Sequence, residues 1–342
     1  MKSIQIQNTW GLDSLTIIDL PEPEAPKPGH VLIRVHAASL NYRDWMMVNG
    51  WYNPNQPLPL VPLSDGAGEV VGVGEGVTRW KIGDRVAGAF TQDWHSGEFK
   101  AAYWQTSTLG GPLPGMLQEH VTLSETGLVK IPDHLSYEEA ATLPCAAVTA
   151  WNGLFVSGNL QAGETVLVQG TGGVSLFALQ FAKLAGARVI ATSSSDAKLA
   201  RAKESGADAI INYKTTPEWG VAARDMTEGG LGVDHVIEVG GAGTLPQSFQ
   251  SVKAGGHIAL IGVLTVQDAA PIDPISILLK SITVRGILVG SREMFENMNR
   301  AISQARLKPV IDRVFPFSET RAALAHLSSG SHFGKVVIRI AE

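Results

Sequence analysis

The segment with the most specific chemical signature is a glycine-rich turn near the middle of the 342-residue chain. An apolar run ends at Gln169, the turn follows as Gly170–Thr171–Gly172–Gly173–Val174–Ser175, and a helical pattern continues to Lys183. A strand that feeds such a turn and helix aims backbone N–H groups and the positive end of the helix dipole at a pyrophosphate. The third glycine of the usual fingerprint is shifted towards Gly173 and Ser175. We therefore predict a dinucleotide site at Gly170, Thr171, Gly172, Gly173 and Val174, with a purely structural turn as the alternative.

The next apolar run ends in residues that favour a phosphate group over a free ribose hydroxyl. An NAD enzyme normally has Asp or Glu there, about twenty residues after the glycines. This chain has Ser193, Ser194 and Ser195, with Lys198 three residues further on. A carboxylate would repel a 2′-phosphate by roughly 1 to 4 kcal/mol at contact distance, whereas hydroxyls and an ammonium attract it. We therefore predict NADP(H) binding through Ser193, Ser194 and Lys198. A compatible structural interpretation is that Ser195 or Asp196 caps the next helix and Lys198 is a solvated surface residue.

Composition and charge narrow the class of protein. The net charge is −5 and there is no block of Lys or Arg, which argues against nucleic acid or an anionic membrane surface as the principal partner. The single cysteine, Cys145, permits no internal disulfide and no Cys-rich structural zinc site. No run approaches about 18 uninterrupted apolar residues and no signal-peptide pattern opens the chain, so we expect a soluble cytoplasmic protein. None of the nine histidines falls in a metal-like cluster, and we interpret them as surface or loop residues.

Two patterns along the chain predict two kinds of structure. The first third reads as strands and turns, and the five glycines between 65 and 77 are typical of strands that bend at a barrel corner. From about 142, short apolar runs alternate with helical patterns, which predicts an α/β fold with a doubly wound parallel sheet. A helix is expected over 294–305 and a last strand over 336–340. The polar, glycine-broken stretch 88–115 is predicted to be a loop over or beside the active site.

Several separated motifs, taken together and in this order, make the chain resemble the medium-chain dehydrogenase/reductase superfamily over essentially its whole length. They are AASLNYRD at 37–44, DGAGEVV at 65–71, GDRV at 83–86, TLPCAAVTAW at 142–151 and GKVV at 334–337. The branch that looks most similar is the zinc-free, quinone oxidoreductase-like and alcohol dehydrogenase-like one, with its enoyl reductase-like members.

The resemblance implies a domain organisation. A GroES-like β-barrel substrate domain would comprise 1–145 and 290–342, and a Rossmann domain, 146–289, would be inserted into it, with the active site in the cleft. A homodimer is also implied, formed through the last Rossmann strand around 282–289. Loops at 45–62 and 92–114 are expected to shape the substrate pocket.

At the position of the catalytic zinc the chain departs from zinc-dependent members. They have Cys, His and Glu where this chain has Asn41, Ser64 and Asp65, and only Cys145 matches a ligand. The lobe with four structural zinc cysteines is absent as well. Because a catalytic zinc takes three Cys, His or carboxylate ligands, we predict chemistry without a metal, and Cys145 as a small buried residue at a helix start.

Without zinc as a Lewis acid, charge that develops on oxygen must be stabilised by hydrogen-bond donors. Reduction of a C=C bond conjugated to a carbonyl, or of a quinone, spreads this charge and needs less electrophilic help than reduction of an isolated ketone. By resemblance, Asn41 lies beside the nicotinamide ribose or the substrate oxygen. Tyr52 matches a tyrosine that lines the pocket, where it would donate a proton directly or through water. Arg43 and Asp44 are predicted to form a structural salt bridge.

Further cofactor contacts follow from the resemblance and from the ends of the strands. Thr149 matches a threonine packed against the nicotinamide. Tyr213 matches a tyrosine beside the adenosine 2′-phosphate, with an exposed strand-end aromatic as the alternative. Positions after later strands are predicted to line the cofactor, and a lysine near the end of the chain to reach it: Gly240, Gly241, Gly262, Val263 and Lys335.

These features together predict an NADPH-dependent oxidoreductase that transfers hydride to a small enone, enal or quinone without catalytic zinc. Two alternatives stay open. A zinc-free alcohol or aldehyde dehydrogenase would oxidise simple alcohols with NADP⁺ and show no enone activity. A non-catalytic NADPH-binding sensor would bind NADPH tightly and turn over no acceptor.

Overall fold

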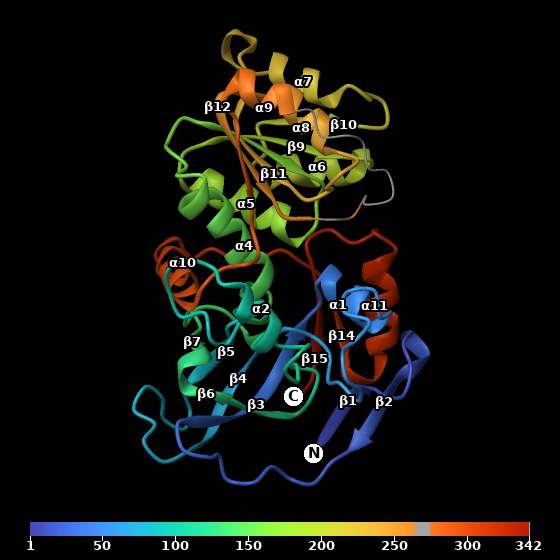
Figure 1. Cartoon of the computed structure of the whole chain (residues 1–342), viewed down its shortest axis with the longest axis vertical. Coiled ribbons are helices and arrows are strands. Elements are labelled where there is room, and N and C mark those ends of the chain that lie inside the picture. The colour runs from blue at the N-terminus through green and yellow to red at the C-terminus, as the bar shows by residue number, and fades with distance from the viewer. Residues whose placement is uncertain (263, 265–273, 342) are drawn as a thin grey trace. The chain divides into compact units, whose positions relative to one another are not determined.

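The computed structural model describes residues 1–262, 264 and 274–341 of the chain. The chain divides into two compact units, Met1–Val148 with Gly290–Glu342, and Thr149–Val289. Both ends of the chain contribute to the first unit, and the second unit is inserted between them (Figure 1). The boundary at 145/146 expected from the sequence lies shortly before this division. None of the described helices has the length and apolar character needed to cross a membrane.

The first unit consists mainly of antiparallel strands. They are β1 (Lys2–Ile6), β2 (Leu15–Asp19), β3 (His30–Ser39), β4 (Asp65–Val73), β5 (Arg85–Gly88), β6 (His120–Ser124), β7 (Leu128–Lys130), β14 (Ile311–Pro316) and β15 (Lys335–Arg339). A seven-stranded sheet runs in the order β14-β15-β3-β4-β5-β7, with β6 also paired to β3, while β1 and β2 form a separate hairpin. The strand β3 therefore connects the two ends of the chain, because it pairs with both β4 and β15.

Two helices of the first unit, α3 (Tyr137–Ala141) and α10 (Arg292–Ala305), begin after a serine whose side chain caps them. The helices of this unit are α1 (Tyr42–Val48), α2 (Ala101–Thr106), α3, α10 and α11 (Thr320–Ser328), with shorter 3₁₀ or π turns at Leu12–Ser14, Glu125–Gly127, Leu143–Ala147 and Phe317–Glu319. Ser291 Oγ accepts the N–H of Met294 at 3.2 Å and starts α10, which confirms the helix predicted over 294–305. The prediction of a loop throughout 88–115 was wrong in one respect, because α2 lies inside it.

Over its described residues, the second unit contains a six-stranded parallel sheet in the order β10-β9-β8-β11-β12-β13. Its strands are β8 (Thr165–Gln169), β9 (Arg188–Ser193), β10 (Ala209–Asn212), β11 (Val233–Glu238), β12 (Val252–Leu260) and β13 (Thr283–Gly286). Its helices are α4 (Val148–Trp151, with its first residue in the other unit), α5 (Gly173–Leu184), α6 (Asp196–Glu204), α7 (Trp219–Asp225), α8 (Leu245–Ser251) and α9 (Pro274–Lys280), with short turns at Asn152–Ser157 and Glu228–Gly230. The predicted α/β class is confirmed, because the strand order reverses between β8 and β11 as in a doubly wound sheet.

Each unit has its own apolar core. In the second unit, Leu167, Val236 and Ile258 lie side by side on neighbouring strands and are fully buried. Parallel strands covered by helices on both faces need such continuous apolar runs. In the first unit, alternate residues of β3, among them Ile33 and Val35, point into the core.

Two histidines contradict the interpretation of all histidines as surface or loop residues. His235 and His257 are paired across β11 and β12 and are only 4% and 6% exposed. Each has a polar partner: His235 Nε2 lies 2.8 Å from Glu164 Oε2, and His257 Nε2 lies 2.9 Å from Ser157 Oγ. Burial, with the nearby charge of His235, lowers the pKa of His257 to about 4, so this ring stays neutral inside the fold.

Candidate active site

The glycine-rich turn joins β8 to α5 in the second unit. Gly170 has a φ of 70°, the left-handed region that favours glycine, and a Cβ at Gly170 or Gly172 would meet no atom within 4 Å. The backbone of the turn is therefore open on that side. Gly172 is the N-cap of α5, and the first turn of this helix carries no acidic residue that would repel an anion. These residues fit a pyrophosphate.

Two hydrogen bonds fix this turn to the sheet. The N–H of Gly170 donates to the carbonyl of Thr192 at the end of β9, at 2.8 Å. Ser175 Oγ donates to the carbonyl of Gln169 at 2.6 Å, and the Ser175 side chain is buried. The serine that stands near the shifted third glycine thus holds the first turn of α5 against the end of β8.

A buried carboxylate organises the loop after β11, and the sequence analysis did not identify it. Glu238 is fully buried, and its Oε1 accepts the N–H groups of Gly240 and Gly241, both at 2.9 Å. Its Oε2 accepts the side-chain amide of Gln169, at the end of the neighbouring strand β8, at 2.6 Å. The hydroxyls that complete the set belong to Thr244 and Ser248. This network fixes the backbone at the point where the strand order reverses, which is where open α/β sheets bind ligands.

The ends of β9 and β10 bring together Ser193 and Tyr213, two of the residues that were predicted to select the cofactor. Ser193 and Asn212 are paired across the two strands, and the N–H of Tyr213 donates to the carbonyl of Ser193 at 3.1 Å. Ser193 is buried, whereas the Tyr213 side chain is 41% exposed at the strand end. The tyrosine is therefore accessible to a ligand that binds at this edge.

The start of α6 confirms the structural interpretation of Ser195. Its Oγ accepts the N–H of Lys198 at 3.4 Å and so caps the helix. Asp196, in the first turn, accepts a hydrogen bond from Asn212 Nδ2 at 2.6 Å. This carboxylate is thus held towards β10, a constraint that the sequence did not reveal.

In the first unit, β15 places Lys335 against the start of α1. Its Nζ donates to the carbonyl of Leu40 at 2.6 Å and to Asn41 Oδ1 at 2.5 Å, and the side chain is only 3% exposed. Asn41 is the N-cap of α1, and its Nδ2 points to Ser64 Oγ at 3.4 Å. The Lys335 ammonium therefore fixes the orientation of the Asn41 amide group, with its oxygen towards Lys335 and its nitrogen towards Ser64.

The carboxylate of Asp65, the first residue of β4, lies beside Lys335 and Asn41. It is fully buried, accepts Ser64 Oγ–H at 2.9 Å and the N–H of Cys145 at 3.2 Å, and its Oδ2 is 3.9 Å from Lys335 Nζ. Burial raises the pKa of Asp65, and the Lys335 charge and the hydrogen bonds oppose the rise. Burial and the Asp65 carboxylate raise the pKa of the Cys145 thiol, so this side chain stays protonated.

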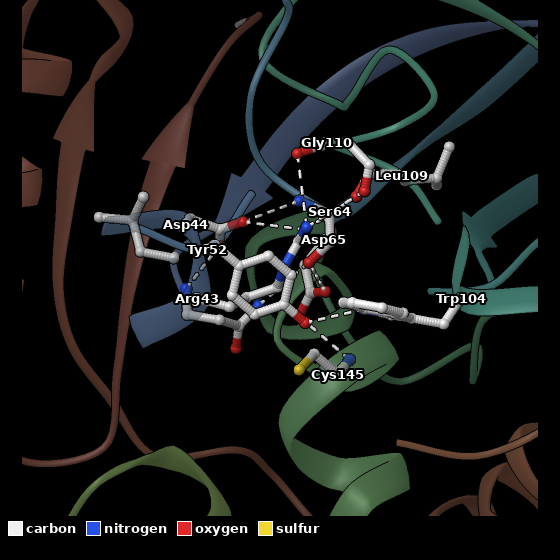
Figure 2. A network of polar contacts seen from close by, with 12 residues as sticks. Arg43, Asp44, Tyr52, Ser64, Asp65, Trp104, Leu109, Gly110 and Cys145 are labelled. Atoms are coloured by element: carbon white, nitrogen blue, oxygen red, sulfur yellow. Dashed lines mark hydrogen bonds and ion pairs between the residues drawn. The ribbon is translucent and has the colours of Figure 1, made fainter. Parts of the chain in front are cut away.

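The predicted salt bridge between Arg43 and Asp44 is confirmed, and it is buried. Arg43 Nη1 lies 3.5 Å from Asp44 Oδ1, and Asp44 also accepts the N–H of Asn41 at 2.8 Å and that of Ser64 at 3.3 Å. Burial raises the pKa of Asp44 to about 6, against the opposing effect of Arg43. Figure 2 shows how this ion pair and the Ser64–Asp65 contact form one network.

The Tyr52 ring lies against the same network (Figure 2). The guanidinium carbon of Arg43 is 4.8 Å from the centre of the Tyr52 ring, within the range of a cation–π contact. The indole Nε1–H of Trp104, on α2, donates to Tyr52 Oη at 3.1 Å. Trp104 was not identified from the sequence, because it lies 52 residues from Tyr52 in the chain and no sequence motif links the two positions.

Comparisons with known proteins identify the family. A family model described as the alcohol dehydrogenase GroES-like domain matches residues 27–133, and one described as zinc-binding dehydrogenase matches residues 173–304. A zinc-type alcohol dehydrogenase-like protein of Schizosaccharomyces pombe is 46% identical over 335 residues, which cover 96% of each chain. The chain belongs to the medium-chain dehydrogenase/reductase superfamily.

Two further relatives show the range of chemistry within this superfamily. The acryloyl-coenzyme A reductase of Metallosphaera sedula is 31% identical over 329 residues, which cover 94% of this chain and 96% of the relative. The solved structure of an NAD-dependent alcohol dehydrogenase has a TM-score of 0.89 and 33% identity, and the match covers 100% of both chains. The chain is therefore an oxidoreductase-type member with a nicotinamide-binding domain, as its motifs predicted.

The residues at the superfamily's zinc position do not fit a zinc ion. Zinc takes Cys, His or carboxylate ligands, whereas here the Asn41 oxygen accepts from Lys335 and both Asp65 oxygens accept from protein donors. An ammonium 3.9 Å from Asp65 further opposes a second cation. In the part of the chain that the structure describes, no group of three or more His, Cys, Asp or Glu side chains could hold a metal ion.

The predicted site residues fall into two groups, one in each unit. Asn41 and Lys335 are in direct contact in the first unit. In the second unit the remaining positions follow the carboxyl ends of successive strands, apart from Thr149, which lies in α4, and Lys198, which lies in α6. Val263 lies outside the described residues.

At two of the glycines predicted to line the cofactor, close packing by itself explains why the residue is glycine. A Cβ at Gly262 would lie 1.6 Å from the carbonyl oxygen of Val239, and one at Gly240 would lie 2.3 Å from Thr244 Oγ1. The fold requires glycine at Gly262 in particular, because the obstructing atom belongs to the backbone. Their residue type alone therefore does not indicate a ligand.

Proposed function

We propose that this chain is an NADPH-dependent reductase that transfers hydride to an alkene conjugated with a carbonyl, or to a quinone, without catalytic zinc. The observation that carries the proposal is the buried ammonium of Lys335, bonded to Asn41 and 3.9 Å from Asp65, at the position where zinc-dependent members have metal ligands. A site without a Lewis acid favours an acceptor whose own conjugation spreads the developing charge. The acryloyl-coenzyme A reductase among the relatives supports the same class of acceptor.

The side chains of the first unit supply hydrogen-bond donors for this reaction. Bound NADPH would supply the hydride. Because Lys335 engages the Asn41 oxygen, the Asn41 amide presents its N–H groups on the other side, towards Ser64. We propose that the acceptor oxygen binds on this N–H side of the amide. We propose that Tyr52 donates the proton that neutralises the charge left on that oxygen, with Arg43 holding the phenol ring in place.

The proposed preference for NADPH rests on the end of β9 and the start of α6. Ser193, Ser194 and Lys198 occupy the position where an NAD enzyme normally has a carboxylate that binds the ribose hydroxyls. The exposed Tyr213 ring lies at the same edge of the sheet. The Asp196 carboxylate, at the start of α6, is held towards β10 by its hydrogen bond from Asn212.

Exchange of Lys198 for Glu tests the preference for NADPH. We expect the dissociation constant for NADPH to rise by about tenfold or more, since a carboxylate would replace an ammonium beside the 2′-phosphate. The constant for NADH should change far less. Titration calorimetry with both cofactors measures the two effects. Lys203→Glu, in the last turn of the same helix, is the matched control for charge reversal. Equal weakening of both cofactors by Lys198→Glu would contradict the assignment.

A second candidate function is a zinc-free alcohol or aldehyde dehydrogenase, which the alcohol dehydrogenase-like relatives favour. A panel of enones, enals and quinones with NADPH, followed by simple alcohols with NADP⁺, separates the two. Turnover of the conjugated acceptors supports the reductase. Turnover of alcohols alone supports the dehydrogenase, and tight NADPH binding without any turnover supports a sensor.

We also propose that the chain forms a homodimer through the outer edge of the parallel sheet. Among the described strands, β13 lies at one edge of this sheet, opposite β10, and the nearby helix α9 exposes Leu278 and Leu279 to 76% and 78%. Exposed leucines beside an unpaired strand edge are typical of an interface. A cytoplasmic location is part of the same proposal, in keeping with a single cysteine and hence no internal disulfide.

Light scattering after size-exclusion chromatography tests the dimer. The wild-type chain should have the mass of two copies, and Leu278→Glu combined with Leu279→Glu should have the mass of one, because charges would be buried at the interface. Leu231→Glu, at a leucine that is 73% exposed on the same unit, should leave the dimer intact. A monomeric wild-type protein would contradict the proposal.

A further inference from the structure

The hydrogen bond between Trp104 and Tyr52 fixes the direction of the tyrosine's own proton. The indole Nε1–H is a donor only, so Tyr52 Oη must be the acceptor of this 3.1 Å bond. The phenolic hydrogen is then left to be donated elsewhere. Within the described part of the chain no second partner for Tyr52 Oη occurs, so the hydrogen is available to a bound molecule.

The Arg43 guanidinium packs against one face of the Tyr52 ring and fixes the position of the ring. The guanidinium lies under the ring at 4.8 Å and donates to the carbonyl of Leu109 at 2.8 Å and to that of Gly111 at 3.3 Å. Arg43 is only 8% exposed. Since Leu109 and Gly111 follow α2 closely in the chain, the same guanidinium holds both the tyrosine and the segment that carries Trp104.

The short helix α2 is kept in place by aromatic contacts and by its own C-terminal residues. Trp94, which is 3% exposed, stacks on Tyr103 with ring centres 6.4 Å apart and meets Phe99 edge-on at 5.2 Å. Thr108 Oγ1 donates to the carbonyl of Trp104 at 3.1 Å. The Trp104 ring meets the Tyr52 ring at an angle of 72°, and Figure 2 shows the indole directed at the tyrosine hydroxyl.

We infer that Trp104 is a positioning residue for proton transfer from Tyr52, an inference that rests on the proposed function. In the step, hydride from NADPH forms a C–H bond at the conjugated carbon of the acceptor. The Tyr52 O–H bond breaks, and its proton forms an O–H bond with the oxygen of the enolate anion that this addition leaves. Trp104 Nε1–H then donates to a phenolate, and hydrogen bonds to charged groups are stronger than those between neutral groups. Tyr52 is half-buried and not enclosed, so solvent can return the proton to it.

Exchange of Trp104 for Phe tests the inference. We expect kcat for enone reduction to fall by about tenfold, with the KM for NADPH unchanged, because the bond that strengthens during proton transfer is lost. The solvent deuterium isotope effect on kcat should rise. In a Tyr52→Phe background the same exchange should have no further effect on kcat. Trp80→Phe removes another indole hydrogen bond of this unit, to Glu125 at 2.8 Å, and should leave kcat unchanged.

A nitrogen-15 spectrum of the indole N–H groups gives a readout that needs no turnover. Tyr52→Phe should shift the Trp104 signal and leave that of Trp80 in place. An unmoved Trp104 signal would overturn the inference, as would a Trp104→Phe effect on kcat of equal size in both backgrounds. If Trp104→Phe does not fold, replacement of Trp104 by benzothienylalanine, which keeps the shape and lacks the N–H, should give the same loss of kcat. A shifted Trp104 signal in a protein that reduces no acceptor would instead count against the proposed function alone.

Discussion

Exchange of Lys335 for Met is expected to lower the free energy of unfolding by about 3 to 5 kcal/mol. The Lys335 ammonium is 3% exposed and donates to Leu40 and Asn41, and it is the cation beside the fully buried Asp65. Its removal leaves a buried carboxylate without a counter-charge and the Leu40 carbonyl without its donor. Urea unfolding of both proteins measures the difference.

Two further variants show whether the loss comes from the buried charge. Lys308→Met removes a lysine that is 64% exposed and paired with Glu139 at 3.0 Å, and it should cost less than about 1 kcal/mol. Combining Lys335→Met with Asp65→Asn should recover part of the loss, because the uncompensated charge disappears. A double variant that loses the sum of both single effects would contradict the role assigned to the ion pair.

Exchange of Tyr52 for Phe is expected to lower kcat for enone reduction by about 100-fold, with little change in the dissociation constant of NADPH. A positioned general acid contributes on the order of 10² to 10⁴ to a rate, and phenylalanine keeps the ring over Arg43 while removing the proton. Steady-state kinetics and cofactor titration measure the two quantities. The signature of a proton donor is this separation of kcat from cofactor affinity.

Tyr137→Phe is the matched control, since Tyr137 lies in α3 of the same unit and stacks on His36 at 4.2 Å. It should leave kcat unchanged. An unchanged kcat in Tyr52→Phe would remove Tyr52 from the chemistry. A parallel rise in the NADPH dissociation constant would indicate that Tyr52 supports binding instead.

The sequence predicts the features that depend on a local pattern. The turn at Gly170–Val174 needs only a strand, small residues and a helix in succession, and the structure contains that succession. The alternation of strands and helices likewise predicts the parallel sheet, because each buried strand must be apolar along its length. The Ser195 cap is local as well, since it joins residues three positions apart.

Contacts between distant segments could not be predicted in the same way. Lys335 lies 294 residues from Asn41 in the chain, and only the pairing of β15 with β3 brings the two together. Trp104 and Glu238 were missed for a related reason. Trp104 acts through a side chain on another segment, and Glu238 is bonded to Gln169 on the neighbouring strand as well as to its own loop. Neither residue type at its position distinguishes a structural role from a functional one. His235 and His257 are buried with Glu164 and Ser157 as their polar partners, and the sequence gives no signal for these two contacts.

The central claim, reduction without a catalytic metal, is tested most directly by one measurement. The purified protein is dialysed against a strong chelator, its zinc content is measured by mass spectrometry, and NADPH oxidation with an enone is then recorded. We predict an unchanged rate at a zinc content far below one ion per chain, and no increase when zinc is added back. Loss of the rate on chelation and its return with zinc would contradict the account.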